Sequence, residues 1–218
     1  MVLRLVFLGP PGAGKGTIAQ RLAENRKLVQ ISTGDLLREE SKSDSALGKR
    51  VRAVMESGQY VDDETVAELV ENRIAGLGKK KGFILDGFPR TMAQAGMLDR
   101  ILEKLGLRLD AALDIEASDS TIVERLSGRR QCRECGKIYH VKNIPPKVPG
   151  KCDSCSGMLF QRDDDKPRVI KTRLETYRQK TKPLIQYYGK KRLLKAIDAN
   201  GEVEENMRNV EKMLDEVE

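Results

Sequence analysis

The chain has 218 residues, of which 39% are hydrophobic and 4% are aromatic, and it contains no tryptophan. Its 40 lysines and arginines outnumber its 33 acidic residues, so the formal net charge is +7 and a nucleic-acid partner is the first hypothesis to weigh. The hydrophobic content suits a folded core, few aromatic residues are present to stack on bases, and no apolar run reaches the roughly 18 residues of a membrane span.

Five short apolar runs are predicted to be strands: Val2 to Leu8, Leu28 to Ile31, Gly82 to Asp86, Ala111 to Ile115 and Leu193 to Asp198. Amphipathic stretches separate them, and the last of these places Val203, Met207, Val210, Leu214 and Val217 at helical spacing. This alternation predicts an α/β fold, with a parallel sheet covered on both faces by helices.

Two stretches interrupt the alternation. Between about Gln30 and Gly76, three helical patterns beginning at Thr33, Ala46 and Asp62 follow one another without a strand. We call residues 32–76 the helical region and expect a small subdomain there. Residues 129–162, called the insert, hold all four cysteines, the only histidine and three of the eight prolines, and their net charge is +6. This composition indicates a module inserted into the larger domain.

A glycine-rich loop follows the first predicted strand, with the sequence GPPGAGKGT from Gly9 to Thr17. Such a loop offers backbone N–H groups and a helix N-terminus to phosphate oxygens, while its lysine reaches the β- and γ-phosphates. The sequence fits G-x-x-x-x-G-K but has Gly16 where Ser or Thr is common, which weakens the case for direct Mg²⁺ ligation by a hydroxyl. The loop predicts a nucleotide-binding protein.

Further polar signals follow the predicted strands. The segment Ser32 to Arg38 comes after the second strand and taken alone would be a helix cap. The segment Asp86 to Arg90 ends the third strand, at the sheet edge where ligands bind in open α/β folds, and Asp86 is a candidate partner of Mg²⁺ through water. Four arginines near the insert complete a set of cations around a polyphosphate: Arg125 and Arg129, spaced i and i+4 on one face of a predicted helix, with Arg162 and Arg173.

Three segments together carry a resemblance to a known family. They are Gly12-Ala13-Gly14-Lys15-Gly16-Thr17, Ser32-Thr33-Gly34-Asp35 and Asp86-Gly87-Phe88-Pro89-Arg90-Thr91. Over essentially its whole length the chain resembles adenylate kinases of the long, bacterial-type form. The resemblance implies a P-loop nucleoside monophosphate kinase fold with a five-stranded parallel sheet, a helical AMP-binding subdomain and a zinc-binding lid. It also implies Mg²⁺-dependent transfer of the terminal phosphoryl group of ATP to AMP, giving two ADP.

The resemblance further implies domain limits and site residues. The core is expected at 1–31, 77–128 and 163–218, the AMP-binding subdomain at 32–61 within the helical region, and the mobile lid at 129–162. The catalytic cations are Lys15, Arg90, Arg125, Arg129, Arg162 and Arg173. ATP is expected at Gly12, Ala13, Gly14, Lys15, Gly16, Thr17, Arg125, Arg129, Ile138, Tyr139 and Gly201. AMP is expected at Thr33, Arg38, Gln59, Tyr60, Val61, Gly87, Phe88, Pro89, Arg90, Gln94, Arg162 and Arg173.

The cysteines form two pairs, Cys132-x2-Cys135 and Cys152-x2-Cys155, separated by sixteen residues. Two such turns complete a tetrahedral zinc site with sulfur about 2.3 Å from the metal, so we expect a structural Zn²⁺ in the insert. Two disulfides and a redox Cys-x-x-Cys are the alternatives. Four thiolates already suffice for zinc, so His140 is not expected to be a ligand.

Two other functions remain as hypotheses, a UMP/CMP or GMP kinase of the same fold and a zinc-ribbon nucleic-acid binder. The matches at Thr33 and Gln94 and the long insert favour AMP as the acceptor. We therefore expect ATP, AMP and ADP as partners, without nucleic acid or membrane, and a cytoplasmic monomer. The sequence leaves open whether the Phe88–Pro89 peptide bond is cis.

Overall fold

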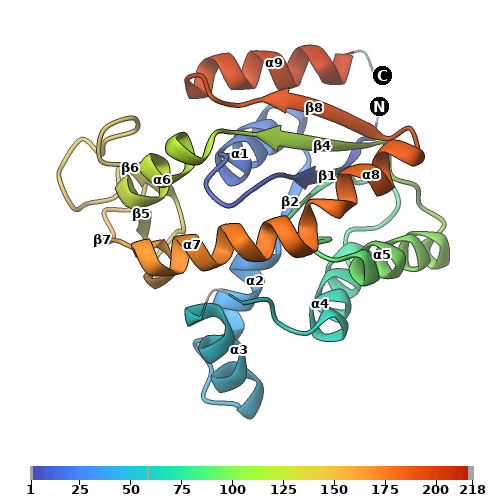
Figure 1. Cartoon of the computed structure of the whole chain (residues 1–218), viewed down its shortest axis with the longest axis horizontal. Helices are drawn as coiled ribbons and strands as arrows, with labels where there is room; N and C mark the ends of the chain where they lie inside the picture. Colours follow the sequence, from blue (N-terminus) through green and yellow to red (C-terminus); the bar gives the residue numbers. More distant parts are fainter. Residues whose placement is uncertain (1, 58, 216–218) are drawn as a thin grey trace.

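A computed structural model describes residues 2–57 and 59–215 of the chain. Its larger sheet has five parallel strands in the order β2-β3-β1-β4-β8 (Figure 1). These are β1 (Arg4–Leu8), β2 (Val29–Ser32), β3 (Phe83–Asp86), β4 (Ala111–Glu116) and β8 (Leu194–Asp198). The predicted α/β fold with a five-stranded parallel sheet is confirmed. Val217 and the two ends of the expected core domain, residues 1 and 218, lie outside the described residues.

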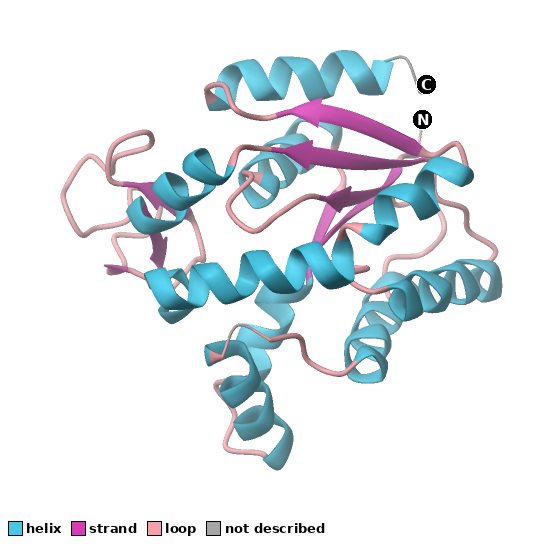
Figure 2. Cartoon of the chain, in the orientation of Figure 1, coloured by secondary structure: helices cyan, strands magenta, loops and turns pink. Residues whose placement is uncertain are grey.

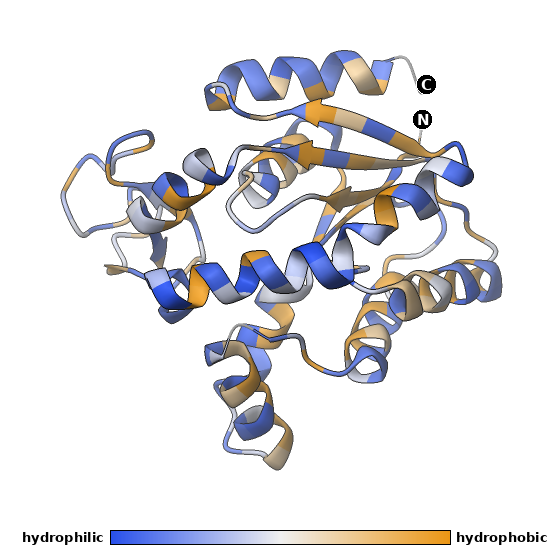
Figure 3. Ribbon diagram, viewed as in Figure 1, coloured by the Kyte–Doolittle hydropathy of each residue, from blue (hydrophilic) through white to orange (hydrophobic). Residues whose placement is uncertain are grey.

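Helices cover both faces of this sheet (Figure 2). On one face, α1 (Lys15–Arg26) and α9 (Val203–Asp215) bury Ile18, Leu22 and Val210 against Phe7 and Leu113 of the strands. On the other face, α5 (Met92–Leu105) and α8 (Pro183–Lys190) belong to a second cluster that includes alternate residues of the same strands. Figure 3 shows hydrophobic residues along the strands and mostly hydrophilic ones along the outer side of α9. The near-continuous apolar runs of the sequence thus reflect strands buried on both faces.

The helical region consists of α2 (Thr33–Glu40), α3 (Ala46–Glu56) and α4 (Asp63–Ala75), close to the predicted starts. The side chains of Ser32, Ser45 and Asp62 accept hydrogen bonds from backbone N–H groups of the first turns, so each helix begins at an N-cap residue. Its buried residues, among them Val51 and Ile74, belong to the same hydrophobic cluster as α5 and α8. The helical region is therefore packed as an extension of the main core.

The insert forms a separate three-stranded antiparallel sheet at one end of the molecule, in the order β6-β5-β7 (Figure 1). Its strands are β5 (Arg129–Cys132), β6 (Ile138–His140) and β7 (Leu159–Phe160). Its own buried cluster consists of Cys132, Tyr139 and Cys152, with Leu159 packed against it.

One sequence expectation is wrong at the start of the insert. Helix α6 (Asp119–Gly128) ends before Arg129, so Arg125 and Arg129 do not share a helical face. Gly128 lies against the His140 ring, where an added Cβ would be 2.1 Å from Nε2, and Arg129 pairs with His140 as the first residue of β5. The pairing of β5 with β6 places Arg129 in a strand, although the i, i+4 spacing predicted that Arg125 and Arg129 share a helix.

The stretch that follows the insert begins with a short 3₁₀ helix, η1 (Asp163–Asp165), and continues as α7 (Pro167–Thr176). A π-helical turn, η2 (Tyr177–Thr181), joins α7 to α8, and within it the Lys182 N–H donates to the Tyr177 carbonyl at 2.9 Å. The turn brings Thr181 against the loop that follows β3. None of the helices in the described part of the chain combines the length and hydrophobicity that a membrane crossing requires.

Candidate active site

A cleft of about 670 Å³ lies at the carboxyl ends of β1, β2 and β3, between the core, the helical region and the insert. The expected site residues that line it are Gly12, Gly14, Lys15, Gly16, Thr17, Thr33, Arg38, Gln59, Tyr60, Val61, Asp86, Gly87, Pro89, Arg90, Gln94, Arg125, Arg129, Ile138, Tyr139, Arg162 and Arg173. Ala13, Phe88 and Gly201 are not among its lining residues. The side chains of Ala13 and Phe88 are buried in the two core clusters instead.

The glycine-rich loop is held tightly between β1 and α1. Gly9 has a φ of +124°, and an added Cβ would lie 2.2 Å from the Ile115 carbonyl oxygen, so only glycine fits there. Gly14, with φ of +102°, precedes α1 and has no side chain that could cap the first turn of that helix. The uncapped N–H groups of this turn are the donors that a phosphate group requires.

Lys15 adds the cation of the loop. Its Nζ donates to the carbonyl oxygens of Gly9 at 2.7 Å and Pro10 at 2.8 Å. Burial lowers the pKa of Lys15 to about 8, and the Asp86 carboxylate opposes this shift. Removing an ammonium group from water destabilises its charged form, and the negative charge of a bound polyphosphate would stabilise that form again.

Three arginines gather around two aspartates where the insert joins the core. Arg129 donates to both oxygens of Asp165, from Nε at 2.7 Å and from Nη2 at 2.5 Å. Arg162 binds Asp164 in the same forked manner, at 2.8 and 2.5 Å. Arg173 lies within 3.2 Å of a carboxylate oxygen of each aspartate. The cluster keeps one positive charge in excess, facing the cleft.

The environment of Asp164 keeps its carboxyl group ionised. Asp165 is fully buried, and although burial acts in the opposite direction, Arg173 and Arg162 hold the pKa of Asp164 well below its usual range. Burial lowers the pKa of Arg173 to about 10, which leaves it charged at neutral pH. Sequence reasoning noted Asp163 and Asp164 only as the residues that follow Arg162 at the exit from the insert, and it gave Asp165 no role.

The opposite side of the cleft holds the segment that follows β3. Thr33 Oγ1 donates to the Gly87 carbonyl at 2.7 Å, and Arg90 Nε donates to the same carbonyl at 2.8 Å. Gln94 accepts from the Arg90 backbone N–H at 2.7 Å. The Phe88–Pro89 peptide bond is cis, which answers the question left open by the sequence. Arg38 pairs with Asp35 at the edge of this second site.

Arg125 and the insert face the glycine-rich loop. Arg125 donates to the Ala13 carbonyl at 3.1 Å and to the Gly201 carbonyl at 2.9 Å, which ties the loop to the segment after β8. Ile138 lies near Gly16, since an added Cβ on Gly16 would be 3.6 Å from Ile138 Cδ1. The neighbouring Tyr139 ring is 2% exposed and turns into the insert, where its hydroxyl meets the Cys152 sulfur at 3.4 Å.

The donor set near the phosphate loop suits a hard divalent cation. Asp86 ends β3 close to Gly16, and its Oδ2 accepts from Gln30 Nε2 at 3.4 Å. A carboxylate beside a phosphate site is the oxygen ligand that Mg²⁺ uses, directly or through its waters. The residues present therefore fit Mg²⁺ bound with ATP.

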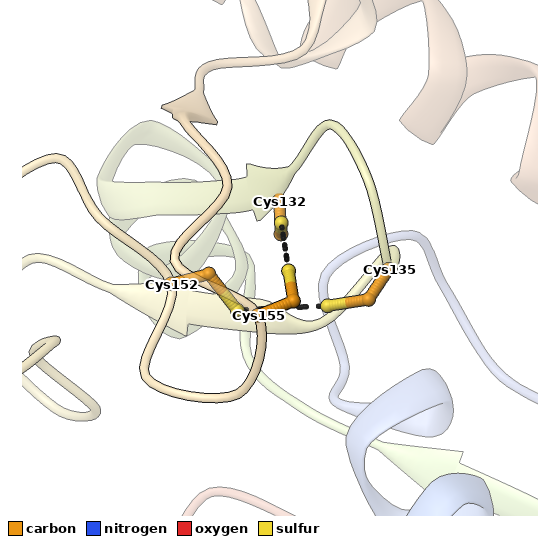
Figure 4. A group of neighbouring side chains, drawn as sticks. All are labelled: Cys132, Cys135, Cys152 and Cys155. Carbon is orange, nitrogen blue, oxygen red and sulfur yellow. Dashed lines mark hydrogen bonds between the residues drawn. The ribbon is translucent and has the colours of Figure 1, made fainter.

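The four cysteines of the insert meet at one point (Figure 4). All four Sγ atoms lie within 4.8 Å of one another, with Cys132 3.4 Å from Cys155 and Cys135 3.5 Å from Cys152. A disulfide requires sulfur atoms about 2.05 Å apart, whereas the edge of a tetrahedral Zn–S₄ site is about 3.8 Å. The cluster therefore fits zinc, and the disulfide alternative does not fit.

The surroundings of the cluster agree with this fit. A hydrogen bond from Tyr139 lowers the pKa of the Cys152 thiol to about 6, which favours the thiolate that binds a metal. Although backbone hydrogen bonds act in the opposite direction, hydrogen bonds among the cysteines raise the pKa of Cys135 and Cys155. Both ring nitrogens of His140 are engaged elsewhere: Nδ1 accepts from the backbone N–H groups of Lys142 and Asn143, and Nε2 lies 3.2 Å from the Glu124 carbonyl oxygen.

A phosphate loop at the edge of a parallel sheet, facing a second arginine-lined site across one cleft, is the arrangement of a P-loop nucleoside monophosphate kinase. The sequence profile of the family described as adenylate kinase matches residues 7–193 of this chain. The chain belongs to the adenylate kinase family. It is accordingly a phosphotransferase that uses ATP with Mg²⁺ and converts ATP and AMP to ADP.

Curated relatives match over nearly their whole length. An adenylate kinase of Thermodesulfovibrio yellowstonii is 50% identical over 208 residues, which cover 95% of this chain and 97% of that protein. One of Archaeoglobus fulgidus is 45% identical over 215 residues, which cover 99% of each chain. One of Caldicellulosiruptor bescii is 48% identical over 212 residues, which cover 97% of this chain and 99% of that protein.

Proposed function

We propose that the cleft performs this reaction with ATP on the glycine-rich loop and AMP on the segment after β3. The observation that supports this assignment is that a single cleft is lined by the glycine-rich loop, by the segment after β3 and by four arginines: Arg125, Arg129, Arg162 and Arg173. We also propose a core at 1–31, 77–128 and 163–218, an AMP-binding subdomain at 32–61 and a lid at 129–162, as expected from the sequence. Tyr139 is proposed to meet ATP through its backbone, because its side chain faces the cysteines.

On the donor side, the backbone of Gly12 to Thr17 would hold the β- and γ-phosphates, and Lys15 would bind their oxygens. Mg²⁺ bound with ATP supplies additional positive charge at the same phosphates. Asp86 would hold waters of this ion. The Gly201 carbonyl, already held by Arg125, is proposed to lie beside the adenine.

On the acceptor side, the AMP phosphate would bind Arg38 and Arg90, while Thr33, Gln94 and the Gln59 to Val61 segment would hold the nucleoside. An oxygen of the AMP phosphate forms the new bond to the γ-phosphorus as the bond to the β-phosphate oxygen of ATP breaks. The attacking phosphate is already an anion at neutral pH, so no general base is needed. The arginines neutralise charge on the transferred group, for which a forked, permanently charged guanidinium is suited.

The hinges of the insert link this chemistry to the exclusion of water. Arg129 and Arg162 are the first and last residues of the insert, so closure of the insert over ATP would bring these two arginines to the phosphates only in a filled site. Zinc would hold the insert rigid through Cys132, Cys135, Cys152 and Cys155. We further propose a cytoplasmic monomer without a nucleic-acid partner. The basic residues of the insert that line the cleft, such as Arg133 and Lys137, would face ATP.

A comparison of phosphate acceptors tests the assignment. With ATP and Mg²⁺, we expect ADP formation with AMP to exceed that with UMP, CMP or GMP by at least about a hundredfold in kcat/KM, because the cleft would leave polar groups of the wrong base unpaired. A coupled assay of ADP measures it. Equal or faster turnover of another monophosphate would replace AMP as the acceptor.

A further inference from the structure

Arg90 differs from most arginines of the cleft in what holds it. Salt bridges to carboxylates fix Arg38, Arg129, Arg162 and Arg173. Within residues 2–57 and 59–215, no salt bridge joins Arg90 to a carboxylate. An arginine side chain has about 2 kcal/mol of rotamer entropy, so a free one is a poor preformed anion site. Other contacts must therefore fix its position.

The backbone of Arg90 is clamped on both sides. Its N–H donates to Gln94 Oε1 at 2.7 Å, and its carbonyl accepts from Thr181 Oγ1 at 2.8 Å. Thr181 is 5% exposed and lies at the end of the π-helical turn η2, far from Arg90 in the sequence. π-Helical turns are rare and occur often at functional sites.

The side chain of Arg90 rests on an aromatic ring. Its Cζ lies 5.0 Å from the centroid of the Tyr60 ring, and its Nε donates to the Gly87 carbonyl at 2.8 Å. The Tyr60 hydroxyl in turn lies 2.9 Å from Thr181 Oγ1. A cation over an aromatic face is stabilised, so the Tyr60 ring helps to hold the guanidinium of Arg90 in place.

The direction of these hydrogen bonds follows from proton count. A threonine hydroxyl has one proton, and a carbonyl oxygen only accepts, so Thr181 donates to Arg90. Tyr60 must then donate to Thr181. One buried hydroxyl therefore fixes both the backbone of Arg90 and the ring on which its side chain lies.

We propose that Thr181 and Tyr60 form a positioning pair that holds the Arg90 guanidinium ready for the phosphate of the acceptor nucleotide. This inference rests on the proposed function, in which Arg90 binds the AMP phosphate. Neither hydroxyl needs to touch AMP. The pair also joins the segment between α3 and α4 to the core, because Tyr60 and Thr181 belong to different parts of the chain.

Thr181→Val tests the pair, because valine keeps the shape of threonine and removes only the hydroxyl. We expect KM for AMP to rise about threefold to tenfold, the usual effect of one lost hydrogen bond, while KM for ATP stays within twofold. Thr181→Ser, which keeps the hydroxyl, should restore the wild-type value. Thr176→Val is the matched control, because Thr176 is also 5% exposed but its hydroxyl donates to Thr172 within α7.

Three readouts separate positioning from a general loss of structure. The affinity for adenosine, which lacks the phosphate, should not change in Thr181→Val. Tyr60→Phe keeps the ring and loses the hydroxyl, so it should also raise KM for AMP. The double variant should raise KM for AMP little more than the single variant with the larger effect does. If Thr181→Val does not fold, as thermal melting would reveal, Tyr60→Phe carries the test alone.

The proposed role of the pair is overturned if Thr181→Val and Thr176→Val have the same KM for AMP. It is also overturned if Thr181→Val lowers the affinity for adenosine as much as the affinity for AMP. Arg90→Lys distinguishes this failure from that of the proposed function. If Arg90→Lys keeps wild-type turnover and AMP affinity, Arg90 itself has no role at the phosphate. If Arg90→Lys loses activity while Thr181→Val and Tyr60→Phe do not, Arg90 acts without the pair.

Discussion

The insert and the helical region both border the cleft, but they are held together in different ways. The helical region shares one hydrophobic cluster with the core, through residues such as Val51, Val70 and Ile74. The insert has a separate cluster of Cys132, Tyr139 and Cys152, two of which are also proposed metal ligands. A segment of this size has too little apolar surface to fold alone, so we propose that a metal supplies the stability that the hydrophobic core supplies elsewhere.

The largest expected effect comes from removing a cysteine. Cys152→Ser should lower the zinc content from about one per chain to near zero and unfold the insert, since structural zinc contributes about 10–16 kcal/mol in small domains. The helical region should keep its fold. Metal analysis and limited proteolysis, with cleavage mapped to residues 129–162, measure both effects. Ser154→Ala changes an exposed neighbour in the same loop and should retain zinc.

That difference between the two regions would vanish if Cys152→Ser left the insert resistant to protease, or if cleavage appeared equally in residues 32–76. The first outcome would mean that the insert is stabilised by its packing on the core and does not depend on the metal. The second would mean that the two regions lose their structure together when the metal is lost.

Shortening a buried side chain in the helical region should have the opposite effect: it should destabilise the whole chain and leave the zinc content unchanged. Ile74 is 2% exposed, and Ile74→Ala should lower the free energy of unfolding of the whole chain by about 2–5 kcal/mol without loss of zinc. Urea unfolding followed by circular dichroism measures this change. Leu159→Ala in the insert is the counterpart, and it should leave the main urea transition nearly unchanged. A separate early transition for Ile74→Ala would show that the helical region is an independent unit.

The hinge between insert and core should respond to acid. Arg173 and Arg162 lower the pKa of Asp164 although burial opposes them, so its contribution to stability is present above the ordinary aspartate pKa of about 4 and is lost as the pH falls below it. Asp164→Asn should cost about 1–3 kcal/mol at pH 7 and flatten this acid dependence. Asp163→Asn, whose carboxylate is 73% exposed, should do neither.

Urea unfolding at several pH values between 3 and 7 measures this dependence. An Asp164→Asn variant as acid-sensitive as the wild-type chain would assign the acid response to other carboxylates.

The smallest expected effect concerns Tyr139. Tyr139→Phe removes the hydroxyl that meets the Cys152 sulfur, so zinc should bind about tenfold more weakly, as for other groups that contact metal ligands. Competition with a coloured chelator measures it. Tyr187→Phe, which removes a hydroxyl bound to Asp99 in the core, should leave zinc affinity unchanged. Equal affinities for both variants would leave the hydroxyl without influence on the metal site.

Local sequence patterns were sufficient for much of the fold and for the shape of the site. The strands, the glycine-rich loop and the cysteine pairs each depend on neighbouring residues, and all are present as predicted. The i, i+4 spacing of Arg125 and Arg129 misled, because strand pairing in the insert ends α6 at Gly128. Local pattern contains no information on a pairing partner that lies elsewhere in the chain.

The residues that sequence reasoning overlooked act through distant contacts. Thr181 meets Arg90 across 91 positions, and Asp165 meets Arg129 across 36. A single threonine in a helical stretch carries no signal of such a role. The position of Tyr139 beside ATP stays a prediction, and sequence reasoning did not foresee that its ring belongs to the cysteine cluster, because neighbouring residues of a strand point to opposite faces.

The separate cluster of the insert also divides the chain into cooperative units. Its few buried side chains are not continuous with the two large clusters of the core, so the insert can open while the five-stranded sheet stays closed. Amide hydrogens of β5 and β6 would then exchange with solvent at a rate set by the concentration of free zinc. Those of β1 and β4 would exchange only on global unfolding. Amide exchange in the insert would thus vary with the supply of zinc, whereas amide exchange in the core sheet would vary with temperature.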